Sequence, residues 1–181
     1  LVAALGVGLG FGLQEIFANF ISGIIILFER PVRIGDVITI GELSGTVNRI
    51  RIRATTIIDF DRKEIIIPNK AFVTERLINW SLTDPVTRVT LKVGFAYGSD
   101  LQACHDVLAK AAADNPRVLQ DPEPLILFMA FGASTLDHEL RVYLGELGDI
   151  LFATNELNRA IDTLAREHGV EIAFNQLDVH L

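Results

Sequence analysis

The sequence contains one cysteine among its 181 residues, Cys104, and this scarcity limits what the protein can be. A single thiol excludes an internal disulfide and is typical of a protein from a reducing compartment. The four histidines are scattered and lack the spacing of metal ligands, both among themselves and relative to Cys104. No combination of nucleophile, base and acid indicates catalysis either. The sequence therefore predicts a protein that is not an enzyme and that uses no metal or cofactor.

Charge is almost absent from the first 28 residues. Between Leu1 and Phe28 the polar residues are Gln14, Glu15, Asn19 and Ser22. An apolar stretch of this length is typical of a membrane helix, and the basic start and small-residue cleavage site of a signal peptide are missing. Because the chain begins without a methionine, we expect it to be part of a longer protein with further membrane segments upstream.

Basic residues follow the apolar stretch, and acidic residues dominate the rest of the chain. Residues 29–92 hold eleven basic and eight acidic side chains, whereas residues 93–181 hold five and fourteen. Arg30 and Arg33 come directly after the apolar stretch, and cationic residues in that place mark the cytoplasmic side of a membrane. We therefore expect Arg30, Pro31 and Arg33 to form the membrane–cytoplasm boundary, with the residues after about 30 in the cytoplasm.

Glycines occupy alternate positions near the start of the chain, at Gly6, Gly8, Gly10 and Gly12. Each glycine costs a helix roughly 0.5–1 kcal/mol relative to alanine, so this spacing requires a compensating contact. At about 100° per residue the four glycines form two separate ridges along a helix. Small residues let membrane helices approach closely. Such a helix suits a ring of identical copies, each of which contacts a neighbour on both flanks.

Two apolar faces lie between the glycine ridges. One holds Val7 and Phe11, and the other holds two leucines. Gln14 and Glu15 fall on the side of Val7 and Phe11, and polar groups at membrane depth face protein or water rather than lipid. We therefore predict that Val7 and Phe11 line a pore and form its constriction. A buried helix in the core of one subunit is the alternative interpretation of the same residues.

The apolar segment is expected to bend where polar residues and a glycine interrupt it, at Gln14, Glu15, Asn19 and Gly23. Beyond the bend, the remaining turns suit either an amphipathic helix on the membrane surface or a continuation of the span. The segment should end at Arg30, because the residue before a proline disfavours helical geometry.

Short β-like runs follow, and then a longer alternation of strands and helices. Strands are predicted over 37–40, 46–58 and 64–67, and the second would carry Arg49, Arg51 and Arg53 on one face. For these arginines a solvated face and a contact with a vestibule or with lipid headgroups both stay open. Later strands are predicted over 86–95, 125–131, 135–144 and 170–174, and helices over 101–115, with Ser99 as its N-cap, and 150–168. That order is the split β-α-β, ferredoxin-like arrangement.

Several motifs in this order resemble those of the small-conductance mechanosensitive channel (MscS) family, and they look closest to its large, many-helix MscK-type members. Besides the glycine-rich helix they are RPVRIGD at 30–36, GTV at 45–47, IIIPN at 65–69 and NWS at 79–81. In the best-known members leucines stand at the positions of Val7 and Phe11, and a glycine stands at that of Glu15. The resemblance extends over essentially the whole chain.

The resemblance implies an α+β membrane protein in four parts. These are a pore-lining transmembrane helix (1–30), a small Sm-like β-barrel domain (31–80), a ferredoxin-like α/β cytoplasmic domain (81–175) and a C-terminal barrel strand (176–181). It also implies a homo-oligomer, a heptamer, in the bacterial inner membrane. Its partners would be membrane lipids and permeating ions and small osmolytes, and not nucleic acid.

Together these observations predict a channel that membrane tension opens on hypo-osmotic shock, with rings of Val7 and Phe11 as a hydrophobic gate. The alternative is a membrane-anchored cytoplasmic module that binds a ligand or RNA. An RNA-binding module should carry a basic patch with interleaved aromatic residues. The C-terminal half is acidic instead, and the chain holds one Trp and two Tyr.

Overall fold

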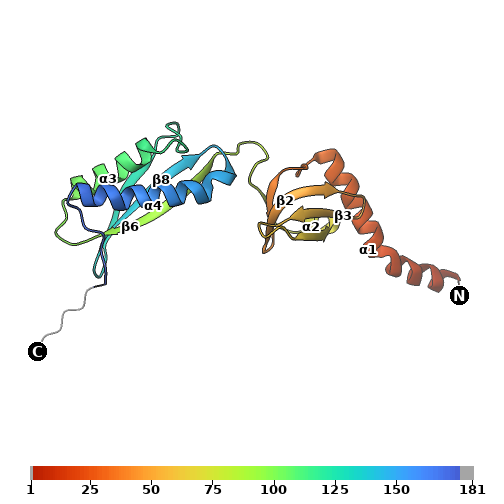
Figure 1. Cartoon of the computed structure of the whole chain (residues 1–181). Helices are drawn as coiled ribbons and strands as arrows, with labels where there is room; N and C mark the ends of the chain where they lie inside the picture. The colour runs from red at the N-terminus through yellow and green to blue at the C-terminus, as the bar shows by residue number, and fades with distance from the viewer. Residues whose placement is uncertain (1, 176–181) are drawn as a thin grey trace, which may run out of the picture. The chain divides into compact units, whose positions relative to one another are not determined.

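The computed structural model describes residues 2–175, with side chains from Val7 onward, so the barrel strand predicted at 176–181 lies outside the described residues. The chain divides into two compact units, Leu1–Asp84 and Pro85–Leu181. Each unit combines helices with an antiparallel sheet, which gives the expected α+β class (Figure 1). The four-part division expected from the sequence remains a prediction.

The first unit begins with one long helix, α1 (Val2–Glu29), which is assigned as helical without a break over 28 residues. It ends next to the expected stop at the Arg30–Pro31 junction. Arg30 takes the left-handed backbone conformation with φ 52°, and its N–H donates to the carbonyl oxygen of Ile26 at 3.0 Å. A left-handed residue at this place closes the last turn of a helix.

The rest of the first unit is a five-stranded antiparallel sheet in the order β4-β3-β2-β1-β5. Its elements are β1 (Val37–Ile40), β2 (Leu43–Ile50), β3 (Ala54–Ile58), β4 (Glu64–Pro68), α2 (Asn69–Thr74) and β5 (Leu77–Asn79). The short helix α2 and the strand β5 were not expected. Eight buried apolar residues form the core of this unit: Ile26, Val32, Ile38, Ile40, Val47, Ile57, Ile67 and Phe72. Since Ile26 belongs to α1, the long helix is part of this core.

The single strand predicted over 46–58 is wrong, because the chain leaves the sheet between β2 and β3. The side-chain amide of Asn69 donates to the carbonyl oxygens of Arg51 and Ile52, at 2.7 and 2.9 Å. These bonds hold the backbone of residues 51–53 in a loop rather than in the ladder. Arg49 consequently lies in β2 and Arg51 and Arg53 in the loop, so the three arginines do not share one strand face.

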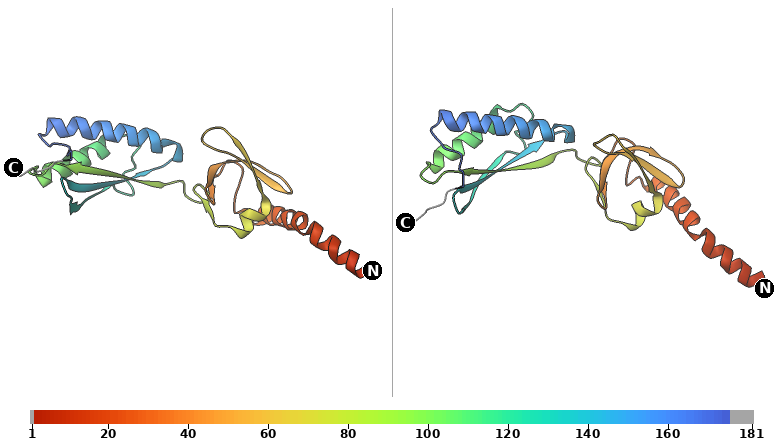
Figure 2. Two further views of the ribbon diagram at one scale, coloured as in Figure 1. Left: turned by 90° about the horizontal axis from the view of Figure 1, so that it is seen from below. Right: turned by 60° about the horizontal axis from the view of Figure 1, so that its bottom comes forward.

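The second unit contains a three-stranded antiparallel sheet with two helices over one face (Figures 1 and 2). Its elements are β6 (Thr87–Phe95), α3 (Leu101–Asp114), β7 (Leu125–Phe131), β8 (Leu136–Leu144), the 3-10 turn η1 (Leu147–Asp149) and α4 (Ile150–Glu167). The sheet order β6-β8-β7 is the one that a ferredoxin-like domain requires. Asp100, not Ser99, caps α3, since its carboxylate accepts from the N–H of Ala103 at 2.8 Å.

The strand predicted over 170–174 is reduced to a single β-bridge. An isolated bridge joins Ile172 to Phe95, and two backbone hydrogen bonds flank it, from Ala96 to Glu171 at 2.8 Å and from Ala173 to Gly94 at 2.9 Å. The bridge lies beside β6, where the fourth strand of a ferredoxin-like sheet belongs. The prediction placed the segment correctly and overestimated its regularity.

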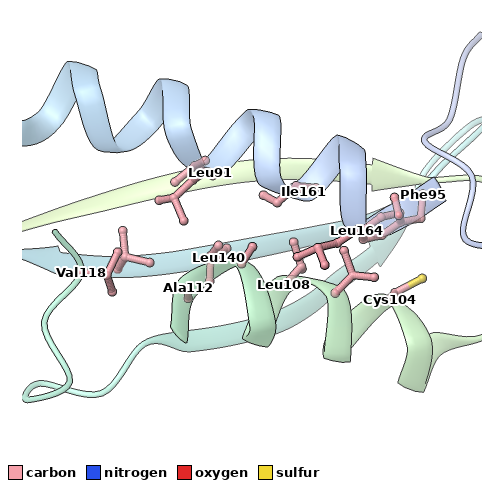
Figure 3. Packing of buried hydrophobic residues seen from close by; sticks show 14 of the residues in the cluster. Leu91, Phe95, Cys104, Leu108, Ala112, Val118, Leu140, Ile161 and Leu164 are labelled. Atoms are coloured by element: carbon pink, nitrogen blue, oxygen red, sulfur yellow. The ribbon is translucent and has the colours of Figure 1, made fainter. Parts of the chain in front are cut away.

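Eighteen buried residues fill the space between this sheet and its helices (Figure 3). Alternate residues of β8 point into this layer, and Leu140 is fully buried among residues of α3 and α4 such as Leu108 and Leu164. Cys104 lies in the same core, and burial raises the pKa of its thiol above the ordinary value. Cys104 is therefore a packing residue of this core.

Candidate pore helix and its contacts

The described apolar side chains in the first half of α1 are exposed. Val7 is 60% exposed and Phe11 is 73% exposed, and the leucines on the opposite face, Leu9 and Leu13, are exposed as well. A core helix of a single subunit would bury at least one of these faces. The described residues therefore do not themselves bury this half of α1, and the choice between a pore helix and a core helix stays a prediction.

Contacts among the described residues do not explain the glycines of this half. A Cβ atom built on Gly8, Gly10 or Gly12 would meet no atom within 4 Å beyond the neighbouring backbone of its own helix. Nothing in the described part of the unit requires a residue without a side chain at these three positions. Because glycine weakens a helix, a reason for the spacing has to come from contacts outside the described residues.

Two of the four predicted bend residues attach α1 to α2. The carboxylate of Glu15 accepts from Nζ of Lys70 at 2.9 Å, and the amide oxygen of Asn19 accepts from the backbone N–H of Lys70 at 2.9 Å. The amide nitrogen of Asn19 donates back to the carbonyl oxygen of Glu15 at 2.8 Å. Lys70 therefore donates a hydrogen bond to each of these two side chains.

Gly23 serves a close approach between α1 and the loop after β2. A Cβ atom at this position would lie 2.2 Å from the carbonyl oxygen of Ile52 and 2.7 Å from the side-chain nitrogen of Asn69. Only glycine fits there without movement of the backbone. Gln14, the remaining predicted bend residue, is exposed. As α1 is assigned as one helix through all four positions, the bend itself stays a prediction.

Asn69 joins three parts of the first unit. Besides its two bonds to the loop carbonyls, its amide oxygen accepts from the hydroxyl of Thr55 in β3 at 2.9 Å. Its backbone N–H donates to the carbonyl oxygen of Arg53 at 3.0 Å. The side chain is fully buried, so each of these bonds is shielded from water. Asn69 thereby fixes the loop against which Gly23 packs.

The predicted boundary residues lie on a loop that two polar side chains hold. The carboxylate of Asp36 accepts from the backbone N–H of Arg33 at 2.9 Å and from the side chain of Asn79 at 2.7 Å. The same Asn79 amide donates to the carbonyl oxygen of Pro31 at 3.1 Å. These bonds join the motif at 30–36 to the motif at 79–81, although 43 residues separate Asp36 from Asn79.

The second half of α1 has a narrow buried face and a wide apolar exposed face. Ser22, Gly23 and Ile26 are buried in the first unit, and Ile26 belongs to its core. The exposed face carries large apolar side chains: Phe17, Phe20, Ile21, Ile24, Leu27 and Phe28. Residues Val7–Glu29 are long and apolar enough to cross a membrane by length and composition.

Sequence reasoning missed Lys70 and Asn69 as contact residues of this helix. The motif at 65–69 drew attention to Asn69, but a pattern of residue types does not reveal where a buried amide donates. The described part of the chain holds no group of three or more His, Cys, Asp or Glu side chains that could bind a metal. The chemistry of this helix is therefore that of packing, hydrogen bonds and one ion pair.

Two family models match the chain. The model of the mechanosensitive ion channel β-domain matches residues 15–82, and the model of the C-terminal part of the mechanosensitive ion channel MscS matches residues 89–172. In the solved structures, the crystal structure of Helicobacter pylori MscS in its closed state is similar with a TM-score of 0.92 at 25% identity. It covers 99% of this chain, which covers 71% of that one.

Two characterised relatives are similar in sequence along the whole chain. The mechanosensitive channel MscK of Escherichia coli (strain K12) is 69% identical over 181 residues, and the miniconductance mechanosensitive channel MscM of the same organism is 48% identical. The chain spans 16% of the length of each of these relatives. Since the matched models, the relatives and the fold agree, the chain belongs to the MscS family of mechanosensitive ion channels.

Proposed function

We propose that the whole protein is a mechanosensitive channel of the bacterial inner membrane that tension opens to release ions and small osmolytes. The observation that carries this proposal is the first half of α1, where the described apolar side chains are exposed and Gly8, Gly10 and Gly12 have open space beside them. Contacts that the described residues do not supply have to come from other copies, from lipid or from upstream segments. In a ring of copies, a heptamer in our proposal, a neighbouring helix would pack against each of the two glycine ridges.

The glycines at 6, 8, 10 and 12 form the contacts between neighbouring helices in this ring. Val7 and Phe11 of all copies then face the axis and form two apolar rings, whereas Leu9 and Leu13 face lipid or neighbouring helices. A narrow apolar passage loses its water and blocks ions without a physical plug. Membrane tension favours the state in which the channel occupies more area in the membrane. Tilting the helices along the glycine ridges widens the two rings without repacking side chains.

The second half of α1 lies on the membrane surface rather than inside the span. Its buried face packs on the core of the first unit, and its exposed apolar face can enter the interfacial layer of the bilayer. Gln14, Glu15, Asn19 and Gly23 mark the change of direction between the halves. Arg30, Pro31 and Arg33 then lie at the cytoplasmic boundary, and the residues after about 30 lie in the cytoplasm.

Recordings of tension-gated currents from the full-length protein test this function. Phe11→Ser should lower the tension threshold and leave the channel leaky, because a polar ring holds water. Gly10→Val should raise the threshold, because a branched side chain obstructs sliding between neighbours. Leu9→Ser makes the change of Phe11→Ser on the opposite face and should leave the threshold near that of the native channel. Unaltered thresholds in Phe11→Ser and Gly10→Val, or a particle without rotational symmetry, would contradict the proposal.

A further inference from the structure

The turn between β3 and β4 carries a large apolar side chain in the open, since Phe60 is 78% exposed. Hydrogen bonds close this turn. The N–H of Asp59 donates to the carbonyl oxygen of Lys63 at 3.0 Å, and the carboxylate of Asp59 accepts from the N–H of Lys63 at 2.7 Å. Arg62 takes the left-handed backbone conformation with φ 71°. Phe60 therefore stands on a fixed turn, so its burial against a partner would cost little backbone entropy.

A hollow of about 540 Å³ lies at the opposite end of the same hairpin. Its lining includes Ile52 and Ile66, which are 59% and 70% exposed, and also Arg51 and Arg53. The side chain of Asn69 holds the backbone of this loop, so the hollow has a fixed wall. The five residues of β3 run from the hollow to the turn, a distance of roughly 13 Å at about 3.3 Å per residue.

The charges at the two ends of the hairpin are opposite in sign. Arg51 and Arg53 form no ion pair with the described residues. The turn segment 59–64 holds three acidic and two basic residues. Asp61, the residue after the exposed phenylalanine, accepts from Nζ of Lys63 with one oxygen at 2.7 Å, and a carboxylate has room for further donors. The turn is thus complementary to the hollow both in its apolar ring and in its charge.

We propose that Phe60 of one copy of the chain inserts into the hollow of a second copy, between Ile52 and Ile66. Asp61 then lies against the two arginines of that copy. The inference rests on the proposed function, since it supplies one contact of the ring. Because the turn and the hollow are different surfaces of one unit, the contact repeats head to tail, as a ring of identical copies requires. A bilayer suits the turn less well, since the turn lies at the end of β3 away from the loop that approaches α1 at Gly23.

The test places the photo-crosslinking residue p-benzoylphenylalanine at position 60 of the full-length protein in its membrane. Irradiation should join two copies into a dimer on a denaturing gel, and peptide mass spectrometry should locate the bond within residues 51–56 or at Ile66. The control carries the same probe in place of Leu43, which is 41% exposed in the same unit outside this hairpin, and should not give this product. A bond from position 60 to lipid or to an upstream segment, or no joined copies, would overturn the proposal.

Charge reversal supplies a second, independent measurement. Arg51→Glu with Arg53→Glu should lower the yield of the crosslinked dimer about tenfold, because two attractive contacts with Asp61 become repulsive. Adding Asp61→Arg should restore most of the yield. Arg49→Glu with Arg76→Glu makes the same change at exposed positions that do not line the hollow, and it should leave the yield near that of the native sequence.

Equal losses in the two pairs of arginine variants, or an undiminished yield in the first pair, would contradict the insertion. Tension-gated currents and the rotational symmetry of the native particle are recorded in parallel. A symmetric channel without the crosslink would exclude this contact and leave the proposed function in place, whereas a particle without symmetry would exclude both.

Discussion

The two halves of α1 have similar apolar sequences and opposite surroundings. From Val7 to Leu13 the helix exposes both apolar faces, and a Cβ atom added at Gly8, Gly10 or Gly12 would meet no atom within 4 Å beyond its own helix backbone. From Glu15 onward the same helix is bonded to α2, approaches a loop backbone at Gly23 and buries Ile26 in the core of the β-sheet unit. Hydrophobicity alone therefore does not tell which part of a helix its own subunit packs.

The difference also shows how the attached half is held. Complete burial of an isoleucine side chain is worth roughly 1.5–3 kcal/mol, whereas an exposed ion pair such as Glu15–Lys70 is worth up to about 1 kcal/mol. Apolar burial at Ile26 thus supplies most of the attachment, and the polar contacts at Glu15 and Asn19 set the rotation of the helix on α2. Substitutions in each half of α1 test this difference.

Ile26→Ala should have the largest effect of these variants. Truncating a fully buried isoleucine costs about 2–5 kcal/mol, because packing is lost and a cavity remains. The first unit should therefore unfold at markedly lower temperature in detergent, and the second unit should keep its native transition. Leu9→Ala, on the exposed half, should change the stability of a dissociated subunit by less than about 0.5 kcal/mol. Equal losses at the two positions would mean that the halves do not differ.

Gly23→Ala should destabilise the first unit by about 1–3 kcal/mol, the usual range for overpacking. The added Cβ atom would lie 2.2 Å from the carbonyl oxygen of Ile52, and backbone atoms move less readily than side chains. Thermal unfolding of dissociated subunits measures the loss. Gly10→Ala is the matched control, and in a dissociated subunit it should stabilise the helix by roughly 0.5–1 kcal/mol. A loss at Gly10 that occurs only in the assembled protein would locate its contact between copies.

Asn69→Ala should cost about 1–3 kcal/mol, because it leaves the carbonyl groups of Arg51 and Ile52 without their donor. The loop that Gly23 contacts should loosen, so the backbone amides of residues 51–55 should exchange with deuterium faster than in the native protein. Asn79→Ala is a control, since its amide holds the loop at Pro31 instead. It should speed exchange at residues 31–36 and leave residues 51–55 protected.

The sequence was sufficient for the parts of the fold that have a regular pattern. Strands β1 and β7 have the predicted bounds, and both helices of the second unit were predicted to within one residue at each end. The strand over 46–58 was wrong, because the residues that end it lie elsewhere: Asn69 is 17 or 18 positions away from the carbonyl groups that it binds. Such bonds leave no trace in local periodicity.

The candidate site divides in the same way. Which residues share a face of α1, such as Val7 and Phe11, follows from spacing along one helix, and their role in a pore stays a prediction. The partner of Glu15 does not follow from spacing, since Lys70 is 55 residues further along the chain. The resemblance to a family drew attention to Glu15 as a departure, and the structure supplies the contact that accompanies it. Spacing thus predicts which residues share a face of a helix. Contacts between residues far apart in the sequence determine which part of the helix is attached to the rest of the unit.

Glu15→Gln should have the smallest effect, and it measures how much the ion pair adds to the attachment of α1. Both side chains are well exposed, so a double-mutant cycle with Lys70→Gln should give a coupling of about 0.2–1 kcal/mol. The coupling should shrink as salt rises towards 1 M, where the screening length is about 3 Å. The bond from Asn19 to the backbone of Lys70 persists in every member of the cycle. It should therefore keep α1 in place, with unchanged protection of the α2 amides from exchange.

A coupling well above 1 kcal/mol, or one that salt leaves unchanged, would show that the pair is shielded from water in the assembled protein. The attached half of α1 would then depend on neighbouring copies, as we propose for the first half.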